Sequence, residues 1–445
     1  MESLLFTRED LKKLIVPLII EQALALSIGL FDTLMVSSCG EAAVSGVSLV
    51  DSISTLLIQI LSALATGGAV VCSQYIGKKM PERAKLSAGQ LMFIMLMSAG
   101  TVMVVILLSY RFLLRAIFGQ IDADVMQNAE IYFIISAISY PFLGVYNAGA
   151  ALFRAIGNSK VSMYTSLVMN VINIGGNAVL IFGLKMGVLG AALATLTARI
   201  VSALVMVVLL SRKDNPLCIA TPGCMKPQRD VIGKILKIGI PSGVENGMFQ
   251  FGKLAIQSTV SLMGTAAIAA QGMTNIIENL NGIMSIGMGI GLMTVVGECL
   301  GAGEKEEAVY YIKKISIAAE VVLIATCLLM FGLTYPITYF GGMEPESAKL
   351  CIFMVTCITI VKPIVWIMAF IPPYGFRAAG DVRFTMTTSM LCMWLCRVVL
   401  AMVLARVFHM GPIAVWIGMF TDWTIRGIIY TIRFKNRKWL AHQVI

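Results

Sequence analysis

The amino-acid sequence predicts an all-α integral membrane protein in which twelve transmembrane helices form two pseudo-symmetric six-helix lobes. Three observations lead to this fold class. Of the 445 residues, 58% are hydrophobic and only 13% are charged, whereas soluble domains carry about 25% charged residues. Apolar runs of about 20 residues, the length of helix that crosses a bilayer, recur along the whole chain. The second half of the chain also repeats landmarks of the first half.

Apolar runs bounded by charged residues, glycine or proline predict where the helices lie. The expected ranges in the first half are 14–36, 47–75, 86–109, 129–153, 162–183 and 187–210. Those in the second half are 238–263, 266–299, 309–333, 349–375, 384–408 and 411–432. The chain begins with polar residues that lead directly into the first run, so we expect no cleaved signal peptide.

Basic residues alternate between two sets of loops, and this alternation predicts the orientation of the helices. The N-terminus, the central loop and the C-terminal tail are rich in lysine and arginine, and so are the loops after the second, fourth, eighth and tenth helices. The other loops hold only Arg111, Arg115, Lys185, Lys349 and Arg406. Cytoplasmic loops carry the excess of positive charge, so we expect both termini in the cytoplasm of a multi-pass protein of the plasma or inner membrane.

An internal duplication relates the two halves of the chain. A shift of 224 residues superposes three pairs of identical residues, which are Pro17 and Pro241, Glu21 and Glu245, and Gly40 and Gly264. Each half holds six helices, an even number, so both copies share one orientation in the membrane. We therefore predict an N-terminal lobe at residues 1–210, a cytoplasmic linker at 211–233 and a C-terminal lobe at 234–445. Such repeats are typical of secondary transporters.

No pattern in the sequence predicts an enzyme, a cofactor or a nucleic-acid partner. Glycine-rich loops with the spacing that binds nucleoside phosphates are absent from the sequence. The two histidines, His409 and His442, lie at or beyond helix ends, so neither a metal site nor a Ser-His-Asp triad is expected. The net charge of +10 comes from loop residues that orient the helices. We expect a monomer whose partners are a small-molecule substrate and membrane lipid.

The first apolar run contains the most informative polar residue of the chain. It holds Pro17 near one end and Asp32 near the other. An ionised carboxylate inside a membrane costs several kcal/mol, which makes Asp32 a candidate for a functional site. Asp51, early in the second helix and at a similar depth, is either a residue at the start of that helix or a second acid of a cavity.

Several stretches of the sequence resemble the MATE (multidrug and toxic compound extrusion) family. These are the first helix with Pro17 and Asp32, the segment QYIGKKMPERA with its repeat ECLGAGEKEEA, and the twin loops FRAIGNSK and FRAAGDVR. The resemblance covers the whole chain and implies a fold of the MATE/MOP type. It implies a secondary antiporter that exports amphipathic, usually cationic compounds in exchange for H⁺ or Na⁺. It also implies that Asp32 is the coupling residue and that Pro17 lets the first helix bend when the acid is protonated.

Two departures from the family pattern concern the coupling ion. In several prokaryotic relatives the fifth helix carries an aspartate four residues after an asparagine, whereas here Asn173 is followed by Asn177. Relatives with a sodium site in the second lobe have acids at the positions of Phe249 and, approximately, Trp366. We therefore expect no sodium site in the second lobe, while Asp32 is open to either H⁺ or Na⁺.

Three asparagines share one face of the fifth helix. Asn170, Asn173 and Asn177 are spaced at i, i+3 and i+7. We expect this stripe to face Asp32 and to bind it or a cation, and the alternative is ordinary hydrogen bonding between helices. Glu21 lies eleven residues before Asp32 on nearly the same face, and we expect it to pair with Arg199, with a second proton site as the alternative.

The second lobe differs because it carries charges of both signs near mid-membrane. These are Lys253, Glu278, Lys362 and Arg397, with Glu245 nearer the cytoplasm. We expect them to form one ion-pair network, since buried charges usually pair. The alternative is that they line the substrate cavity, where a spare positive charge would favour substrates with an acidic or zwitterionic group.

The equivalent positions of the first half carry residues of different chemistry. Arg397 corresponds to Asn173, and Lys253 corresponds to Gly29. A basic second lobe also suits an alternative function, a flippase for a lipid-linked anionic precursor. Such flippases commonly have fourteen helices, however, and this chain ends soon after its twelfth. We therefore predict an antiporter.

Overall fold

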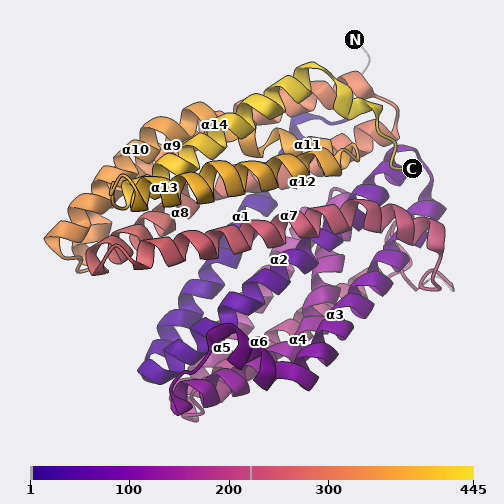
Figure 1. Cartoon of the computed structure of the whole chain (residues 1–445). Coiled ribbons are helices and arrows are strands. Elements are labelled where there is room, and N and C mark those ends of the chain that lie inside the picture. Colours follow the sequence, from indigo (N-terminus) through magenta and orange to yellow (C-terminus); the bar gives the residue numbers. More distant parts are fainter. Residues whose placement is uncertain (1–3, 221–222) are drawn as a thin grey trace. The chain divides into compact units, whose positions relative to one another are not determined.

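A computed structural model describes residues 4–220 and 223–445, which form helices joined by short connections, with no β-strand in these ranges (Figure 1). The helices of the first half are α1 (Arg8–Ser37), α2 (Glu41–Gly77), α3 (Pro81–Phe118), α4 (Ala123–Ala155), α5 (Ser159–Asn177) and α6 (Val188–Leu210). Those of the second half are α7 (Arg229–Ser261), α8 (Thr265–Gly301), α9 (Lys305–Phe340), α10 (Pro345–Phe370), α11 (Pro372–Ala378), α12 (Val382–Leu391), α13 (Leu400–Arg406) and α14 (Ile413–Lys435). Two π-helices, η1 (Ala178–Gly183) and η2 (Cys392–Val399), and the short 3-10 helix η3 (Lys438–Ala441) complete the described chain.

The described ranges make twelve long helical segments, because α5 continues into η1, α10 continues into α11, and α12 continues through η2 into α13. Ten of these segments are long and apolar enough to cross a membrane. The other two, α7 and α14, carry charged residues inside their apolar stretches. Many helices extend beyond the expected ranges, since their ends continue through polar residues outside the apolar runs. The predicted all-α membrane fold is confirmed.

The duplication is visible in the backbone. Helices α2 and α8 each contain 37 residues and are offset by 224 residues. The glycines that precede them, Gly40 and Gly264, have φ values of 104° and 99°, which a residue with a Cβ rarely adopts. Lys185 and His409, which are also 224 positions apart, have φ values of 53° and 51°. The two halves thus repeat helix lengths and turn geometry together.

Contacts divide the described chain into two compact units. The first unit is Thr7–Gly243, and the second joins residues 4–6 to Val244–Val444. The division falls inside α7, whose first half packs with α1–α6. The lobes at residues 1–210 and 234–445 and the linker at 211–233 stay predictions, and residues 1–3 and 221–222, including Pro222, lie outside the described residues.

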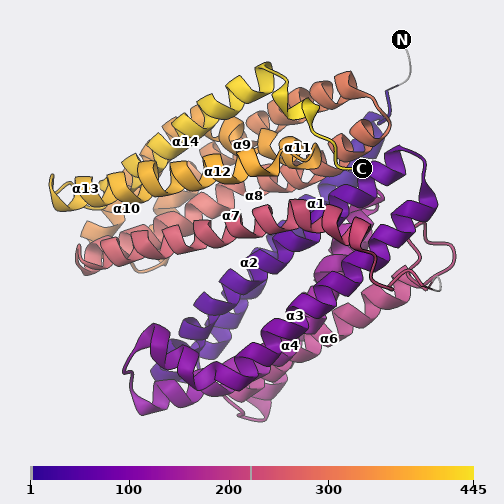
Figure 2. The ribbon, with the colours of Figure 1, turned by 45° about the vertical axis from the view of Figure 1, so that its right-hand side comes forward.

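Helix α4 is the centre of the first unit. It packs against α2, α3 and α6 (Figure 2). Helix α5 packs against both α1 and α6. The backbone of α2 approaches the start of α7 so closely that a Cβ on Gly67 would lie 2.5 Å from the carbonyl oxygen of Ile235. The side chain of Gln90 in α3 holds the central loop, since its Nε2 donates to the carbonyl oxygens of Cys224 and Lys226 at 2.7 Å each.

Helix α10 has the equivalent place in the second unit, where it packs against α8, α9 and α14. Helix α14 in turn packs against η2 and α13. The second half of α7 joins this group through a buried apolar cluster made of Ile256, Val260, Met393, Val398 and Val415. These contacts place α7 beside η2, which matters for the charged residues described below.

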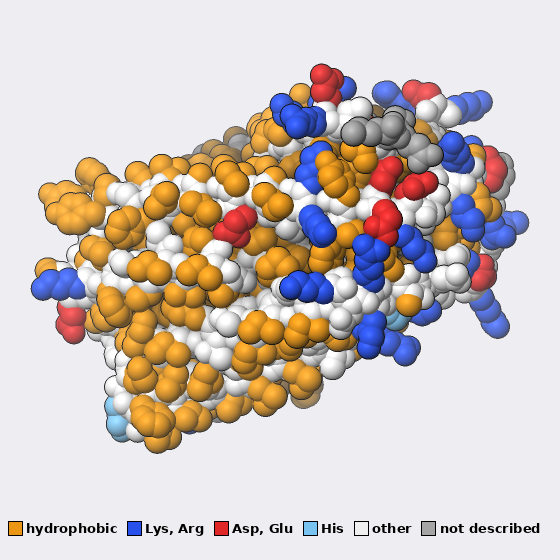
Figure 3. Space-filling view, turned by 90° about the horizontal axis from the view of Figure 1, so that it is seen from above, with side chains coloured by type: hydrophobic (Ala, Val, Ile, Leu, Met, Phe, Trp, Pro, Cys, Tyr) orange, Lys and Arg blue, Asp and Glu red, His pale blue; other side chains and the backbone are white. Residues whose placement is uncertain are grey.

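The face in Figure 3 is apolar along most of its length, and lysine and arginine side chains gather toward one end. Large apolar side chains project from the surface, among them Leu108, Phe340 and Ile364. Lipid is the solvent in which such a surface is stable, because an exposed apolar area of this extent is rare on soluble monomers.

Candidate functional site

Asp32 lies near the C-terminal end of α1 and contacts the amide side chains of α5. The Nδ2 of Asn177 donates a hydrogen bond to Oδ1 of Asp32 at 2.6 Å. The side chain of Asn173, one turn earlier, lies within electrostatic range of Asp32, and its Oδ1 accepts from Nδ2 of Asn177 at 3.5 Å. Its own Nδ2 donates to Oγ1 of Thr195 in α6 at 3.1 Å, which fixes the orientation of the amide. The structure therefore brings Asp32, Asn173 and Asn177 together, because α1 packs against α5.

The third member of the predicted stripe does not join this group through its amide donor. The Nδ2 of Asn170 donates to the carbonyl oxygen of Ser166 in its own helix at 2.9 Å. Asn170 is buried, and its assignment to a substrate cavity stays a prediction.

The Asp32 group contains an unused hydrogen-bond acceptor. Asn173 and Asn177 are only 2% and 0% exposed, whereas Asp32 is half-buried. Within the described chain, Oδ1 of Asn177 has no hydrogen-bond partner, although buried polar atoms are nearly always paired. The π-helix η1 begins directly after Asn177, and π-turns inside helices often lie at functional sites. This oxygen is available to a proton on Asp32 or to a cation.

Asp51 is a neighbour of this group. It lies ten residues inside α2, so it is not a residue at the start of that helix. Its carboxylate lies near the buried Tyr132 of α4 and within electrostatic range of Asp32. A role for Asp51 in substrate binding stays a prediction.

The predicted pair of Glu21 with Arg199 is wrong. Glu21 instead forms an ion pair with Arg154, whose Nη1 lies 3.3 Å from its Oε1, and accepts a hydrogen bond from Ser162 at 2.7 Å. Arg199 donates to Oγ of Ser139 at 2.6 Å and lies within electrostatic range of Asp32. Depth along the helices could not distinguish the two arginines, and Arg154 in the last turn of α4 is the one that lies at ion-pair distance from Glu21.

Pro17 interrupts the backbone hydrogen bonds of α1, and α5 compensates for the interruption. Proline has no N–H, so the carbonyl of the residue four positions earlier, Lys13, loses its helical donor. Oγ of Ser159, the first residue of α5, donates to the carbonyl oxygens of Lys13, at 3.4 Å, and Leu14. Helices α1 and α5 are thus joined by polar contacts near both ends, at Ser159 and at Asp32.

The close ion pairs of the second unit fall into three groups and do not form the expected single network, although Glu278 also lies within electrostatic range of Lys253 and Arg397. Glu245 pairs with Arg377 at 2.8 Å. Glu278 pairs with the fully buried Lys362 at 2.6 Å, and Lys362 also donates to Asn281. The third group is formed by Asp422 with Arg426 at 2.7 Å, and Arg397 lies beside it. Three of these residues, Arg377, Asp422 and Arg426, were outside the predicted set.

The i, i+4 spacing of Asp422 and Arg426 on a helix is a sequence pattern that could have revealed this pair. Arg377 was expected in a loop, but the structure places it in α11. A substrate-binding role for Glu245, Lys253, Glu278, Lys362 and Arg397 stays a prediction.

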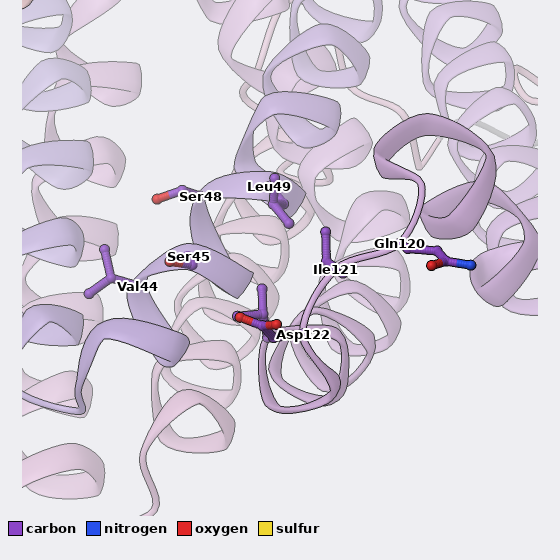
Figure 4. A pocket seen from close by; sticks show the side chains of 8 residues that line it. Val44, Ser45, Ser48, Leu49, Gln120, Ile121 and Asp122 are labelled. Carbon is purple, nitrogen blue, oxygen red and sulfur yellow. The ribbon is translucent and has the colours of Figure 1, made fainter. Parts of the chain in front are cut away.

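A pocket of about 580 Å³ lies between α2 and the connection from α3 to α4 (Figure 4). Its lining residues are Val44, Ser45, Ser48, Leu49, Gln120, Ile121, Asp122 and Val125. This set includes none of the residues that the sequence predicts for the coupling or substrate sites. The candidate site therefore rests on the contacts of Asp32.

Comparisons with known proteins show the family of the chain. The sequence model of the MatE family matches the chain twice, over residues 17–179 and 241–403. The uncharacterized transporter YisQ of Bacillus subtilis is 26% identical over 433 residues, which cover 95% of this chain and 93% of YisQ. The probable multidrug resistance protein NorM of Thermotoga maritima is 24% identical over 446 residues, which cover 98% of this chain and 94% of NorM.

Solved structures share the fold of the chain. Crystal structures described as MATE in the straight and in the bent conformation have TM-scores of 0.90 and 0.87, at 19% and 20% identity. They cover 96% and 97% of this chain, and the chain covers 95% of each. The two matches to the family model are offset by the same 224 residues as the internal repeat and together span more than half of the sequence. The chain is therefore a member of the MatE family, the multidrug and toxic compound extrusion transporters, and a multi-pass membrane protein.

Proposed function

We propose that this transporter is a secondary active antiporter that exports amphipathic, cationic compounds from the cell in exchange for H⁺ or Na⁺. The observation that carries this proposal is the 2.6 Å hydrogen bond from Asn177 to Asp32. Through this bond, the ionisation of one intramembrane acid depends on a contact between two helices. A coupling ion that binds Asp32 must compete with that contact.

The neutralising ion has a partner available at this position. A proton on Asp32 turns the carboxyl group into a donor, and Oδ1 of Asn177 is a buried acceptor with no partner in the described ranges. A sodium ion would instead find carboxylate and amide oxygens, which are the ligands that hard cations prefer. Either ion would reorganise the contact between α1 and α5, which also includes Ser159 and the carbonyl group freed by Pro17.

Ion binding would therefore favour bending of α1 at Pro17. Substrate and ion compete through this conformational change, and the difference in ion affinity between the two states supplies the coupling free energy. The two repeats would alternate access to the substrate by rocking of the predicted lobes, as in other transporters built from repeats. We place the protein in the plasma membrane as a monomer with both termini in the cytoplasm, in accord with the basic loops.

The test is transport by purified protein in proteoliposomes. Efflux of ethidium is measured with a pH gradient and a sodium gradient imposed separately, for wild type and for Asp32→Asn. Wild type should respond to one of the gradients, and Asp32→Asn should respond to neither. Asp122→Asn removes an exposed acid of the same unit and serves as the matched control. Gradient-driven efflux by Asp32→Asn would overturn the proposal.

The comparisons do not favour the flippase alternative, because the relatives described above are a transporter and a probable multidrug resistance protein.

A further inference from the structure

We propose that the second unit contains a binding site for an oxyanion group of an amphipathic substrate, formed by Lys253 of α7 and Arg397 of η2. The group could be a carboxylate, a sulfonate or a phosphate, since the same pair of cations recognises each of them. This inference rests on the proposed export function and adds the chemical class of one substrate group to it.

Lys253 and Arg397 are held together by an aromatic ring. The Nζ of Lys253 lies 5.1 Å from the centre of the Phe249 ring, and the guanidinium carbon of Arg397 lies 5.4 Å from the same centre. The two cations are within electrostatic range and repel each other, and Glu278, which pairs with Lys362, attracts both of them from a longer distance. Attraction to a ring face is weaker than a full ion pair, so it does not neutralise two charges inside a membrane.

Arg397 is a buried guanidinium without a hydrogen bond. Its side chain is only 8% exposed, and the structure shows no hydrogen-bond acceptor for it among the residues it describes. The nearest carboxylate oxygen, Oδ2 of Asp422, is 3.9 Å away. The other oxygen of Asp422 accepts two hydrogen bonds from Arg426, at 2.7 and 3.1 Å. A charged group in this state is costly unless it gains a partner, and an oxyanion ligand would be that partner.

Lys253 completes the positive site. Its side chain is exposed, and no carboxylate of residues 4–220 or 223–445 lies within 4 Å of its Nζ. The neighbouring cations differ in this respect, because Lys362 has Glu278 at 2.6 Å and Arg426 has Asp422 at 2.7 Å. Among these four cations, Lys253 and Arg397 are thus the two with no carboxylate oxygen at hydrogen-bond distance, since that of Asp422 lies 3.9 Å from Arg397.

The repeat supports a ligand-binding role for this place in the fold. Arg397 is offset by 224 residues from Asn173, and α7 is the repeat of α1. The first and fifth helices of the first repeat hold Asp32 with its amides, and the same two helices of the second repeat hold the cation pair. A π-helix follows Asn177 in one copy and contains Arg397 in the other. Equivalent helices therefore carry an acid with its amides in one unit and two cations in the other, although the position of Asp32 itself is taken by Ile256 in the second repeat.

Equilibrium binding to the purified full-length protein tests the inference with two matched compounds. A fluoroquinolone carries a carboxylate, and its methyl ester replaces that carboxylate with an uncharged group of similar size. Wild type should bind the acid more tightly than the ester. Lys253→Met and Arg397→Met should each lower the ratio of acid to ester affinity by about tenfold, the effect of losing one charge-assisted hydrogen bond. Lys349→Met removes an exposed lysine of the same unit and should keep the wild-type ratio.

Two further measurements test the proposal. Arg397→Lys keeps the charge and should retain most of the preference for the acid, which separates loss of charge from loss of folding. Inorganic phosphate should displace the acid far less effectively than a second amphipathic carboxylate does, and equal displacement would make this a site for small anions and overturn the proposal. A wild-type protein that binds acid and ester equally, or Met variants that keep the ratio, would overturn it too. Absence of ion-driven export by wild type would instead refute the proposed function, because the binding ratio needs no gradient.

Discussion

The carboxylate of Glu21 lies 3.3 Å from the guanidinium of Arg154, and the duplication repeats this ion pair as Glu245 with Arg377 at 2.8 Å. The glutamates are 224 positions apart and the arginines 223. Each pair joins the first helix of its repeat to the end of the fourth segment, so the two units retain one polar contact while their candidate sites differ in charge. We infer that these pairs hold the helices together in the fold.

This inference predicts that Glu21→Gln and Glu245→Gln both destabilise the protein. Each leaves a largely buried arginine without its charge partner, which costs about 3–5 kcal/mol for a buried pair. Thermal unfolding of purified protein measures the effect as a fall in Tm. Glu130→Gln is the matched control, since its pair with Arg111 is 3.6 Å long and 66% exposed on the arginine side, and such pairs contribute about 0–1 kcal/mol. Equal Tm values for Glu21→Gln and Glu130→Gln would contradict the inference.

Ser159 should be coupled to Pro17 in a double-mutant cycle. Ser159→Ala removes the donor that reaches the carbonyl of Lys13 and should cost about 1 kcal/mol. In a Pro17→Ala background the helix regains its own N–H donor for that carbonyl, so the same change should cost less. Unfolding free energies of the four proteins give the coupling. Strict additivity would show that Ser159 does not compensate for the proline.

Gly67 should tolerate no side chain, because of its contact with the backbone of α7. Gly67→Ala places a Cβ 2.5 Å from the carbonyl oxygen of Ile235, and backbone cannot move as a flexible side chain can. Overpacking of this kind costs about 1–3 kcal/mol. Gly100→Ala is the control, because a Cβ there meets no atom within 4 Å and alanine favours the helix. A Gly67→Ala protein as stable as Gly100→Ala would refute this account of the contact.

Asn177→Ala should impair coupling more than stability. It removes the donor to Asp32, a charge-assisted hydrogen bond whose loss changes an equilibrium by about tenfold. The measurement is the ion concentration that gives half-maximal efflux. Asn128→Ala is the matched control, since its amide donates only within α4, to the carbonyl oxygen of Asp124. An unchanged half-maximal concentration in Asn177→Ala would argue against a coupling role for this amide.

Apolar runs and the repeat were sufficient to predict the helical membrane fold, because both follow from the period and length of helices in a bilayer. Helix ends were harder to predict, since α1 begins at Arg8 and α3 ends at Phe118, beyond the apolar runs. The contact of Asp32 with Asn177 was within reach of the sequence because the asparagines share one helical face.

Partners of the charged residues could not be predicted as well. Glu21 was assigned to Arg199 from depth alone, but rotation of the helices and the reach of the side chains select Arg154. In the second unit, Arg397 was expected to belong to one ion-pair network. In the structure, Arg426 forms the close ion pair with Asp422. Pair selection depends on tertiary packing, which spacing along one helix does not encode.

The measurement that tests the central claim most directly is the ion movement that substrate drives. A substrate gradient is imposed across proteoliposomes that have equal pH and equal sodium on both sides, and H⁺ or Na⁺ flux is followed with an internal pH dye or with labelled sodium. If Asp32 couples the two movements, one of these ions should flow in the direction opposite to the substrate in wild type, and neither should flow in Asp32→Asn. Ion flux in Asp32→Asn equal to that of wild type would contradict the account.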